Sequence, residues 1–353
     1  MAKTLVCIIN HMNYGGAQKV VYALAKGSAL KYRVILVCKP GVYSDVLKSK
    51  YNIEIFDRQK LTFHGWKSYL DSLRQNKSEL IIHTHNRKDL LLKIFFKRID
   101  IHIHTFHSVY PGKNYLYKIL RPDISISISK AVSEYLNRYD VNNILILNGI
   151  DAEIPDERLM KERCISSCGK KLLYVGRLSP EKGISEFLYS FKDLNLRDIG
   201  YTLTIIGDGE IRDALERYCI DNGLSKIVTF LGAKLRPWND TLGYDVVVIP
   251  SHYEGFGLVG VEATIHGIPI IANDLKVLRE VLYYIDDRCF FDINKTKTIW
   301  DTIQFVSDNY SMLALKCIQK SKVFYDYYSE DKMIKSYHQV YNSYLDYSGE
   351  NKH

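Results

Sequence analysis

Residues that could do chemistry gather in one stretch, VVVIPSHYEGFGLVGVEATIHGIPIIAND, at positions 246–274. Two glutamates, Glu254 and Glu262, flank the glycine-rich segment Gly255, Phe256, Gly257 and Leu258. Backbone N–H groups at such a turn, together with the positive end of the helix that follows, bind anions such as phosphates. A carboxylate beside a phosphate repels it unless the carboxylate is directed at another group, for example a sugar hydroxyl. The stretch therefore predicts a ligand that carries both phosphate and sugar.

Two cations stand in a second loop, GRLSPEKG, at positions 176–183. Arg177 can hold a phosphate through its planar fork, whereas Lys182 would act as a point charge. Either side chain alone could be an ordinary solvated loop charge. Because both occur in one loop after an apolar run, we favour a role in binding the ligand.

The elements that must position these residues alternate between strands and helices. The run 246–249 reads as a strand, the residues after Gly257 as a helix, and 270–271 as the start of another strand, which together make a parallel βαβ unit. Apolar runs elsewhere predict further strands at 5–9, 33–37, 53–56, 80–83, 101–105, 124–128, 144–147, 172–175, 201–206 and 227–231. Strands that alternate with helices indicate doubly wound parallel sheets.

The first strand runs into Gly15 and Gly16, after which 17–29 has apolar residues at helical spacing. A glycine pair at a helix N-terminus lets the backbone approach a ligand closely. A tight strand-to-helix turn explains the same pair, and taken alone it is the favoured explanation.

Five histidines lie within two neighbouring strand ends: His83, His85, His102, His104 and His107. Residues two apart on a strand share a face, so a metal site is conceivable. No accompanying carboxylate stands out, and we favour polar residues at the edge of a sheet, one of which acts on substrate. No metal is expected.

Composition is that of a globular protein, with 46% hydrophobic and 25% charged residues in 353. No apolar run is long enough to cross a bilayer or to form a signal peptide core, so we expect a cytoplasmic protein, with its seven cysteines as reduced, mostly buried thiols. Residues 1–165 contain 26 Lys and Arg against 15 Asp and Glu, whereas the remainder contains 22 against 25. This asymmetry suggests two domains with different partners.

At this point several motifs agree with a known family. The chain resembles the family 4 glycosyltransferases, and the resemblance covers residues 5 to 280. The motifs that carry it are GGAQ (15–18), NGID (148–151), VGRLSPEKG (175–183), IIGDGEIRDAL (205–215), EGFGLVGVE (254–262) and HGIPIIAND (266–274). Val259 departs from the family, which usually has proline there; proline would only stiffen the first helical turn.

The resemblance implies an α/β protein of the GT-B fold, with two Rossmann-like doubly wound parallel-sheet domains facing a central cleft. We place an acceptor-binding domain at 1–165 and a nucleotide-sugar-binding domain at 166–325. The segment 326–353 is expected to form a helix that packs back on the first domain, through an apolar face that includes Ile334, Tyr337 and Tyr341.

The resemblance also implies a role for each matched residue. Arg177 and Lys182 would hold the donor diphosphate, helped by backbone N–H groups of Gly15 and Gly16 and of 255–258. Glu262 would accept hydrogen bonds from the ribose, and Glu254 from hydroxyls of the donor sugar. His107 falls where the family has a histidine near the reacting sugar. These five side chains and the two glycine segments are the predicted site.

The implied reaction is transfer of a sugar from a nucleoside-diphosphate sugar, expected to be UDP-linked, to a glycan or lipid-linked acceptor in cell-surface polysaccharide synthesis. Transfer would proceed with retention and without metal, because Arg177 and Lys182 supply positive charge and no Asp-x-Asp motif is present. No cofactor is expected. Alternatives are a nucleotide-sugar epimerase or hydrolase on the same fold, or a basic module that binds nucleic acid or lipid without catalysis. A dehydrogenase is disfavoured because Arg212 stands where the third glycine of GxGxxG belongs.

Residues 87–121 are rich in cations and apolar side chains, which suggests a membrane contact. The residues are Lys88, Lys93, Lys97, Arg98, Lys113, Lys118 and Arg121, with Leu90, Leu91, Phe95, Tyr115 and Tyr117. Such a surface could hold the protein on the inner face of an anionic membrane, and we expect no nucleic acid partner. Two ordinary amphipathic helices with solvated lysines explain the pattern nearly as well.

Overall fold

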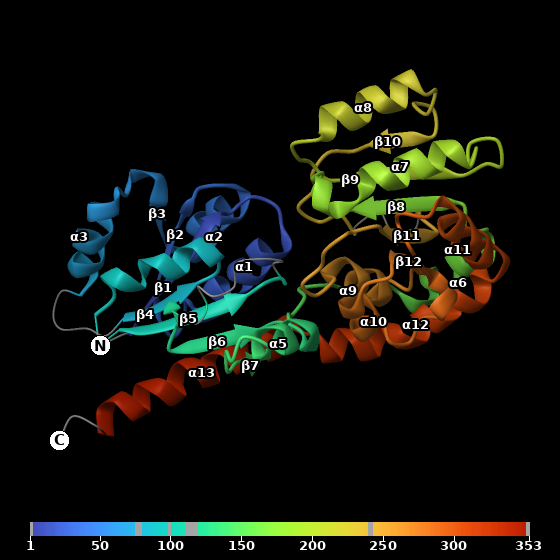
Figure 1. The fold of residues 1–353 in the computed structure, drawn as a ribbon. Helices are drawn as coiled ribbons and strands as arrows, with labels where there is room; N and C mark the ends of the chain where they lie inside the picture. The colour runs from blue at the N-terminus through green and yellow to red at the C-terminus, as the bar shows by residue number, and fades with distance from the viewer. Residues whose placement is uncertain are drawn as a thin grey trace. The chain divides into compact units, whose positions relative to one another are not determined.

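The computed structural model describes residues 3–74, 80–97, 100–109, 117, 119–238 and 243–350. The chain forms two compact units (Figure 1). Unit 1 is Met1–Asp151 together with Ser329–His353, and unit 2 is Ala152–Tyr328. Both units are parallel α/β sheets, so the fold class predicted from the alternating pattern is confirmed.

Unit 1 is built on a seven-stranded parallel sheet in the order β3-β2-β1-β4-β5-β6-β7. Its strands are β1 (Thr4–His11), β2 (Arg33–Lys39), β3 (Glu54–Asp57), β4 (Leu80–Thr84), β5 (Ile101–Phe106), β6 (Ile124–Ser127) and β7 (Ile144–Leu145). The order reverses at β1, which pairs with β2 on one side and with β4 on the other. Ligands of open parallel sheets bind at the carboxyl ends of strands at such a reversal.

Helices cover both faces of this sheet. α1 (Gly16–Ser28) packs Val20, Val21 and Leu24 on the face that carries the odd-numbered residues of β1. α3 (Phe63–Leu73) and the 3₁₀ helix η3 (Arg87–Phe95) pack on the opposite face. α2 (Val42–Tyr51), η1 (Arg58–Lys60) and α5 (Lys130–Asn137) complete the connections.

The C-terminal helix α13 (Glu330–Glu350) also belongs to unit 1 and packs against α1. Its residues Met333, Ile334, Tyr337, Val340 and Tyr341 are buried in the same apolar cluster as α1 and β1. The apolar stripe read from the sequence is therefore the face that α13 buries.

Unit 2 has a six-stranded parallel sheet in the order β10-β9-β8-β11-β12-β13. Its strands are β8 (Lys171–Val175), β9 (Thr202–Ile206), β10 (Val228–Phe230), β11 (Val246–Ile249), β12 (Ile270–Asn273) and β13 (Phe290–Phe291). The last of these was not predicted, because two residues are too few to give a periodic signal. Here the strand order reverses between β8 and β11.

Both faces of the second sheet are covered as well. α7 (Ile184–Asp193), α8 (Arg212–Asp221) and α11 (Thr296–Asp308) pack on the face that carries Val246 and Val248. α9 (Leu258–Ile265) lies against β11 and β12, with Gly260 beside Ile249. The other helices are η4 (Pro180–Lys182), α6 (Glu157–Ser166), α10 (Lys276–Val281), η6 (Asp287–Cys289) and α12 (Tyr310–Tyr327).

The division between the units falls after Asp151, earlier than the boundary drawn at residue 165. The reason is α6, which packs on α12 and so belongs to unit 2. Its Arg163 donates to the carbonyls of His266 (2.9 Å) and Gly267 (2.7 Å) at the end of α9. The charged composition of this segment resembles a linker, although its contacts are those of a packed helix.

Candidate active site

The reversal point of unit 2 brings together the two loops that the sequence singled out. Residues 176–183 follow β8 and residues 250–257 follow β11, and these strands pair directly. The backbone N–H of His252 donates to the carbonyl of Glu181 (3.0 Å), so the two loops are joined by their main chains. Gly183 adopts φ 65°, and a side chain there would clash with the carbonyl of Pro250. Glycine is therefore required for the loops to meet this closely.

A third loop supports the first. Gly207 and Gly209 follow β9 and lie so close to the backbone of residues 176–178 that a Cβ on either would clash. The N–H of Leu178 donates to the carbonyl of Asp208 (2.9 Å). These two glycines thus allow close backbone packing. This role is consistent with the prediction that they are not part of a dinucleotide-binding motif.

Lys182 and Glu254 meet at this junction. The ammonium Nζ lies 2.6 Å from Glu254 Oε1, and Ser251 Oγ donates to the same oxygen at 2.8 Å. The two charged side chains are 22% and 15% exposed, so both are largely shielded from solvent but still accessible. Asn273 Nδ2 in turn donates to the carbonyl of Ser251 (3.0 Å). The pair is a preformed charged site held by neighbouring strand ends.

Arg177 lies in the same loop but is more exposed. Its guanidinium is 53% exposed and lies 3.5 Å from Glu181 Oε1. The hydroxyl of Tyr174 donates to the carbonyl of Arg177 (2.8 Å) and so fixes the backbone, and burial, with help from Glu254, raises the pKa of Tyr174. Burial opposes the charged form of Glu181, but hydrogen bonds from its backbone and Ser179, with Arg177 and Lys182 nearby, lower its pKa overall. The Arg177 side chain is therefore accessible to an anion in solution.

The segment 255–258 leads into the N-terminus of α9. Gly257 has φ 92° and precedes the first helical residue, Leu258. Phe256 is 2% exposed and packs edge-on against Tyr328 at 5.5 Å, so its side chain is part of the core and only its backbone can face a ligand. Glu262, in the second turn of α9, is 4% exposed. Both predicted glutamates are therefore placed by the βαβ unit, one before α9 and one within it.

In unit 1 the predicted residues lie at the carboxyl ends of β1, β4 and β5. Gly15 precedes α1 and Gly16 opens it, where the N–H of Lys19 donates to the Gly15 carbonyl (3.0 Å). The N–H of Asn10 donates to Asn86 Oδ1 at 2.6 Å, which links the carboxyl end of β1 to the loop after β4. His107 directly follows β5.

The five histidines divide between the two faces of the sheet. His102 and His104 both contact Thr84 Oγ1, at 2.9 and 2.7 Å, on one face. His83, His85 and His107 lie on the other, where Ile103 and Thr105 also point. Burial lowers the pKa of His102 to about 3 and that of His107 to about 4. Within the described residues no group of three His, Cys, Asp or Glu side chains is arranged to hold a metal ion.

The basic segment 87–121 begins with a 3₁₀ helix instead of an ordinary amphipathic α-helix. Residues 87–95 form the 3₁₀ helix η3, and Leu90 and Tyr117 are buried at 1% exposure. Lys93 lies against the Arg121 carbonyl, and Lys97 pairs with Asp71 at 2.8 Å. Arg98, Lys113, Tyr115 and Lys118 lie outside the described residues. Among the described residues of this segment, Leu91, Ile94 and Ile119 are large apolar side chains that are exposed.

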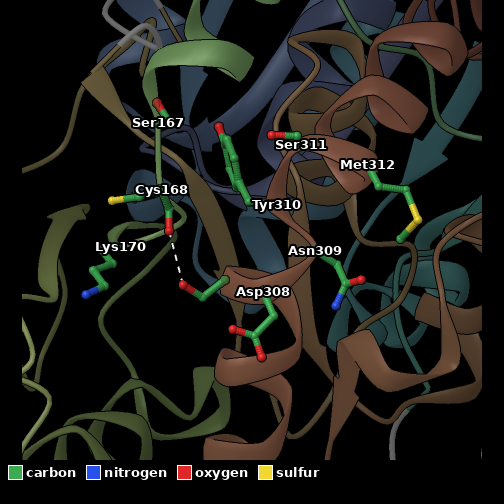
Figure 2. Close-up of a pocket in the computed structure, with 9 residues that line it drawn as sticks. Ser167, Cys168, Lys170, Asp308, Asn309, Tyr310, Ser311 and Met312 are labelled. Atoms are coloured by element: carbon green, nitrogen blue, oxygen red, sulfur yellow. Dashed lines mark hydrogen bonds between the residues drawn. The ribbon is translucent and has the colours of Figure 1, made fainter.

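A separate cavity of about 390 Å³ lies in unit 2, between the residues before β8 and the junction of α11 with α12 (Figure 2). Ser307 Oγ donates across it to the carbonyl of Cys168 (3.1 Å). Lys170 Nζ donates a hydrogen bond to the carbonyl of Ile199 (2.9 Å). None of the predicted site residues lines this cavity. We assign it no part of the chemistry.

Sequence reasoning missed the residues that support the site. Ser251, Asn273 and Tyr174 each fix a functional loop through a hydrogen bond. A serine, an asparagine and a tyrosine carry no signal of their own. Only the meeting of β8, β11 and β12 gives them a role.

Two family models match this chain. A family model described as glycosyl transferases group 1 matches residues 156–324, and one described as glycosyltransferase family 4 matches residues 14–154. The chain belongs to the family 4 glycosyltransferases. The two matches meet between the units, so each model describes one parallel-sheet domain.

Relatives of this chain include an uncharacterized glycosyltransferase of Methanocaldococcus jannaschii, 31% identical over 240 residues, which is 64% of this chain and 60% of the relative. An O-antigen biosynthesis glycosyltransferase of Escherichia coli is 31% identical over 140 residues, 39% of this chain and 38% of that one. The matched part thus spans 60% or less of the length of these two relatives.

The fold has solved counterparts. Anabaena HepE, in a crystal structure with UDP and glucose, superposes with a TM-score of 0.79 at 15% identity, over 97% of this chain and all of that one. At this identity the likeness establishes the fold, which is GT-B. The fold expected from the sequence motifs is therefore confirmed. No helix in the described part of the chain is both long and apolar enough to cross a membrane.

Proposed function

We propose that this protein transfers a sugar from a nucleoside-diphosphate sugar to a glycan or lipid-linked acceptor. The observation that carries the proposal is the Lys182–Glu254 pair at the reversal point of the unit 2 sheet, next to the N-terminus of α9. A cation suited to phosphate and a carboxylate suited to hydroxyls lie within one hydrogen bond of each other. A nucleotide sugar carries its phosphate and a sugar hydroxyl on neighbouring carbon atoms.

Each charged group has a distinct part in the reaction. Negative charge grows on the diphosphate as the glycosidic bond breaks, and Lys182, Arg177 and the first N–H groups of α9 stabilise it. Glu254 accepts hydrogen bonds from the donor sugar. Glu262 accepts them from the ribose. His107 hydrogen-bonds the reacting sugar. The backbone N–H of Gly16 adds a further dipole that stabilises the diphosphate.

The proposed stereochemistry is retention. The acceptor hydroxyl attacks carbon 1 of the sugar from the face that the diphosphate leaves, and a phosphate oxygen takes the hydroxyl proton. The bond to the acceptor oxygen forms as the bond to the phosphate oxygen breaks, so no enzymic nucleophile is consumed. Transfer proceeds without a divalent cation, since the lysine and arginine already offset the charge of the leaving group.

Two comparisons support the substrate classes. UDP and glucose are bound in the Anabaena HepE structure, which favours a UDP-linked donor here. The Escherichia coli relative is an O-antigen biosynthesis glycosyltransferase, which favours a cell-surface polysaccharide as the product.

Product analysis tests the proposal. The purified protein is incubated with a panel of UDP-, GDP- and ADP-linked sugars, with and without lipid-linked acceptors, and the products are separated. A new glycoside with the anomeric configuration of the donor is expected. An epimerised donor identifies an epimerase, and free sugar that forms equally without acceptor identifies a hydrolase. Either outcome overturns the proposal.

We also propose that the segment 87–121 contacts an anionic membrane. Leu91, Ile94 and Ile119 are 53%, 62% and 71% exposed, and Lys88 and Arg121 of the same segment are exposed as well. Apolar side chains that enter the headgroup layer, with cations worth about 1 kcal/mol each near an anionic surface, give reversible attachment. Because Lys97 is paired with Asp71, its charge is partly offset, and the apolar side chains carry more of the binding than the sequence suggested.

A further inference from the structure

His85 contacts His107 at the carboxyl edge of the unit 1 sheet. His85 follows β4 and His107 follows the neighbouring parallel strand β5, so both side chains extend from one face. His85 Nδ1 lies 3.0 Å from His107 Nε2, with the ring centroids 5.3 Å apart. The N–H of His85 donates to the carbonyl of Ile8 at 3.0 Å, which anchors its backbone to β1. The motifs that carry the family resemblance give His85 no role.

The ring of His85 is held from its other side by His83. The two rings lie 4.1 Å apart at 36°. Both nitrogens of His83 are engaged, Nδ1 with the hydroxyl of Tyr341 on α13 and Nε2 with Thr105 Oγ1, each at 2.8 Å. His83 is therefore a fixed support, and α13 contributes to it.

The outer nitrogens, meaning the ring nitrogens of His85 and His107 that do not face each other, have no such partners. His85 Nε2 and His107 Nδ1 are both buried and have no hydrogen-bond partner in the described part of the protein. Burial lowers the pKa of both rings, with neighbouring histidines adding to the effect at His85, so both rings are neutral near pH 7.

A hydrogen bond between two neutral imidazoles needs one N–H and one lone pair. If His85 Nδ1 carries the proton, His107 Nε2 must be bare, and His107 then carries its proton on Nδ1. If His107 Nε2 carries the proton, His85 Nδ1 is bare, and His85 then carries its proton on Nε2. The two rings must therefore be the same tautomer, both Nδ1–H or both Nε2–H. In either case their outer nitrogens present one donor and one acceptor.

We propose that His85 is a positioning residue that fixes the tautomer and the orientation of His107, and so decides whether His107 offers the donor sugar a proton or a lone pair. The consequence for catalysis rests on the proposed function, in which His107 contacts that sugar. The coupling between the two rings does not depend on it.

Ring nitrogen NMR of the full-length, ¹⁵N-histidine-labelled protein tests the coupling directly. Signals are assigned from the spectra of His85→Asn and His107→Gln. The expected result is one tautomer for each ring and the same tautomer for both. Opposite tautomers, or a mixture at His107 in the unaltered protein, would overturn the proposal.

Variants test the consequence. His85→Leu should give a tautomer mixture at His107 and lower kcat on the order of 10- to 100-fold, with KM changed little. His85→Asn places an amide where Nδ1 stood and should recover most of the loss. His102→Leu removes a buried histidine from the opposite face of the same strands and serves as the matched control, with kcat near that of the unaltered protein.

The outcomes separate the two proposals. If His85→Leu keeps a single His107 tautomer and loses no more activity than His102→Leu, His85 is only structural and the inference fails. Should His85→Leu not fold, the tautomer match in the unaltered protein and the kcat of His85→Asn still decide. If His107→Gln transfers sugar normally, the catalytic role of His107 fails, whereas the tautomer match is unaffected.

Discussion

Removing the Lys182 ammonium should weaken UDP binding in two ways at once. The attraction between ammonium and diphosphate is lost, and the carboxylate of Glu254 is left without its partner. Lys182 Nζ lies 2.6 Å from Glu254 Oε1, and a phosphate oxygen that accepts from another N–H of the same ammonium would lie about 2.8 Å from Nζ. Because the N–H groups of an ammonium are about 109° apart, the carboxylate and phosphate oxygens would then be separated by about 4.4 Å.

At that separation two unit charges repel by about 4 kcal/mol with an effective dielectric constant of about 20, and by about 0.9 kcal/mol in bulk water. Both side chains are less than a quarter exposed, so the value lies between these limits. We expect Lys182→Ala to weaken UDP binding by on the order of 10²-fold. Glu254→Gln alone should leave UDP binding unchanged or tighter, because it releases the ammonium for the phosphate, while it depresses sugar transfer.

The double variant decides the reasoning. Lys182→Ala/Glu254→Gln should bind UDP about tenfold more tightly than Lys182→Ala, because the glutamine no longer repels the diphosphate as the unpaired Glu254 carboxylate does. Isothermal titration calorimetry with UDP measures all four proteins. Glu216→Gln in the Lys182→Ala background is the control, because Glu216 pairs with Arg212 on α8 and should give no rescue. Equal affinities for the single and the double variant would refute the placement of the diphosphate beside Lys182.

Four further predictions follow from the same site and surface. Arg177→Ala should lower turnover by on the order of 10²-fold with the melting temperature unchanged, because the side chain is half exposed; normal turnover would remove it from the mechanism. Glu262→Ala should weaken UDP binding by about tenfold but leave pyrophosphate binding unaltered, and calorimetry that shows equal losses for both would exclude a ribose contact. Transfer should persist in excess EDTA; activity abolished by the chelator and restored by a divalent cation would show that metal is required. Vesicles with anionic lipid should sediment the protein at low salt, and Leu91→Asp/Ile94→Asp should release it while Leu30→Asp, a change at a 99% exposed leucine, should not; equal binding to neutral vesicles would contradict an anionic contact.

The sequence determined the fold class because its signal is local. Apolar runs such as 246–249 and 172–174 are buried on both faces, as strands of a covered parallel sheet must be. The glycines of the two unit 2 loops were also predictable from the sequence, because Gly183 and Gly257 adopt backbone angles that other residues avoid. The two predicted unit 2 loops were therefore visible before their geometry was known.

Tertiary structure alone decided which of these groups meet. Lys182 and Glu254 are 72 positions apart, and nothing in their local sequence sets their separation at 2.6 Å; the pairing of β8 with β11 does. Likewise, the five histidines form one cluster in the sequence but occupy two faces in the sheet, because strand residues alternate and β4 pairs with β5 in a fixed register. That register joins His85 to His107 and gives His83 a partner, Tyr341, from the far end of the chain. Periodicity predicts which residues face a core, whereas the register and the packing of distant elements determine which polar atoms touch.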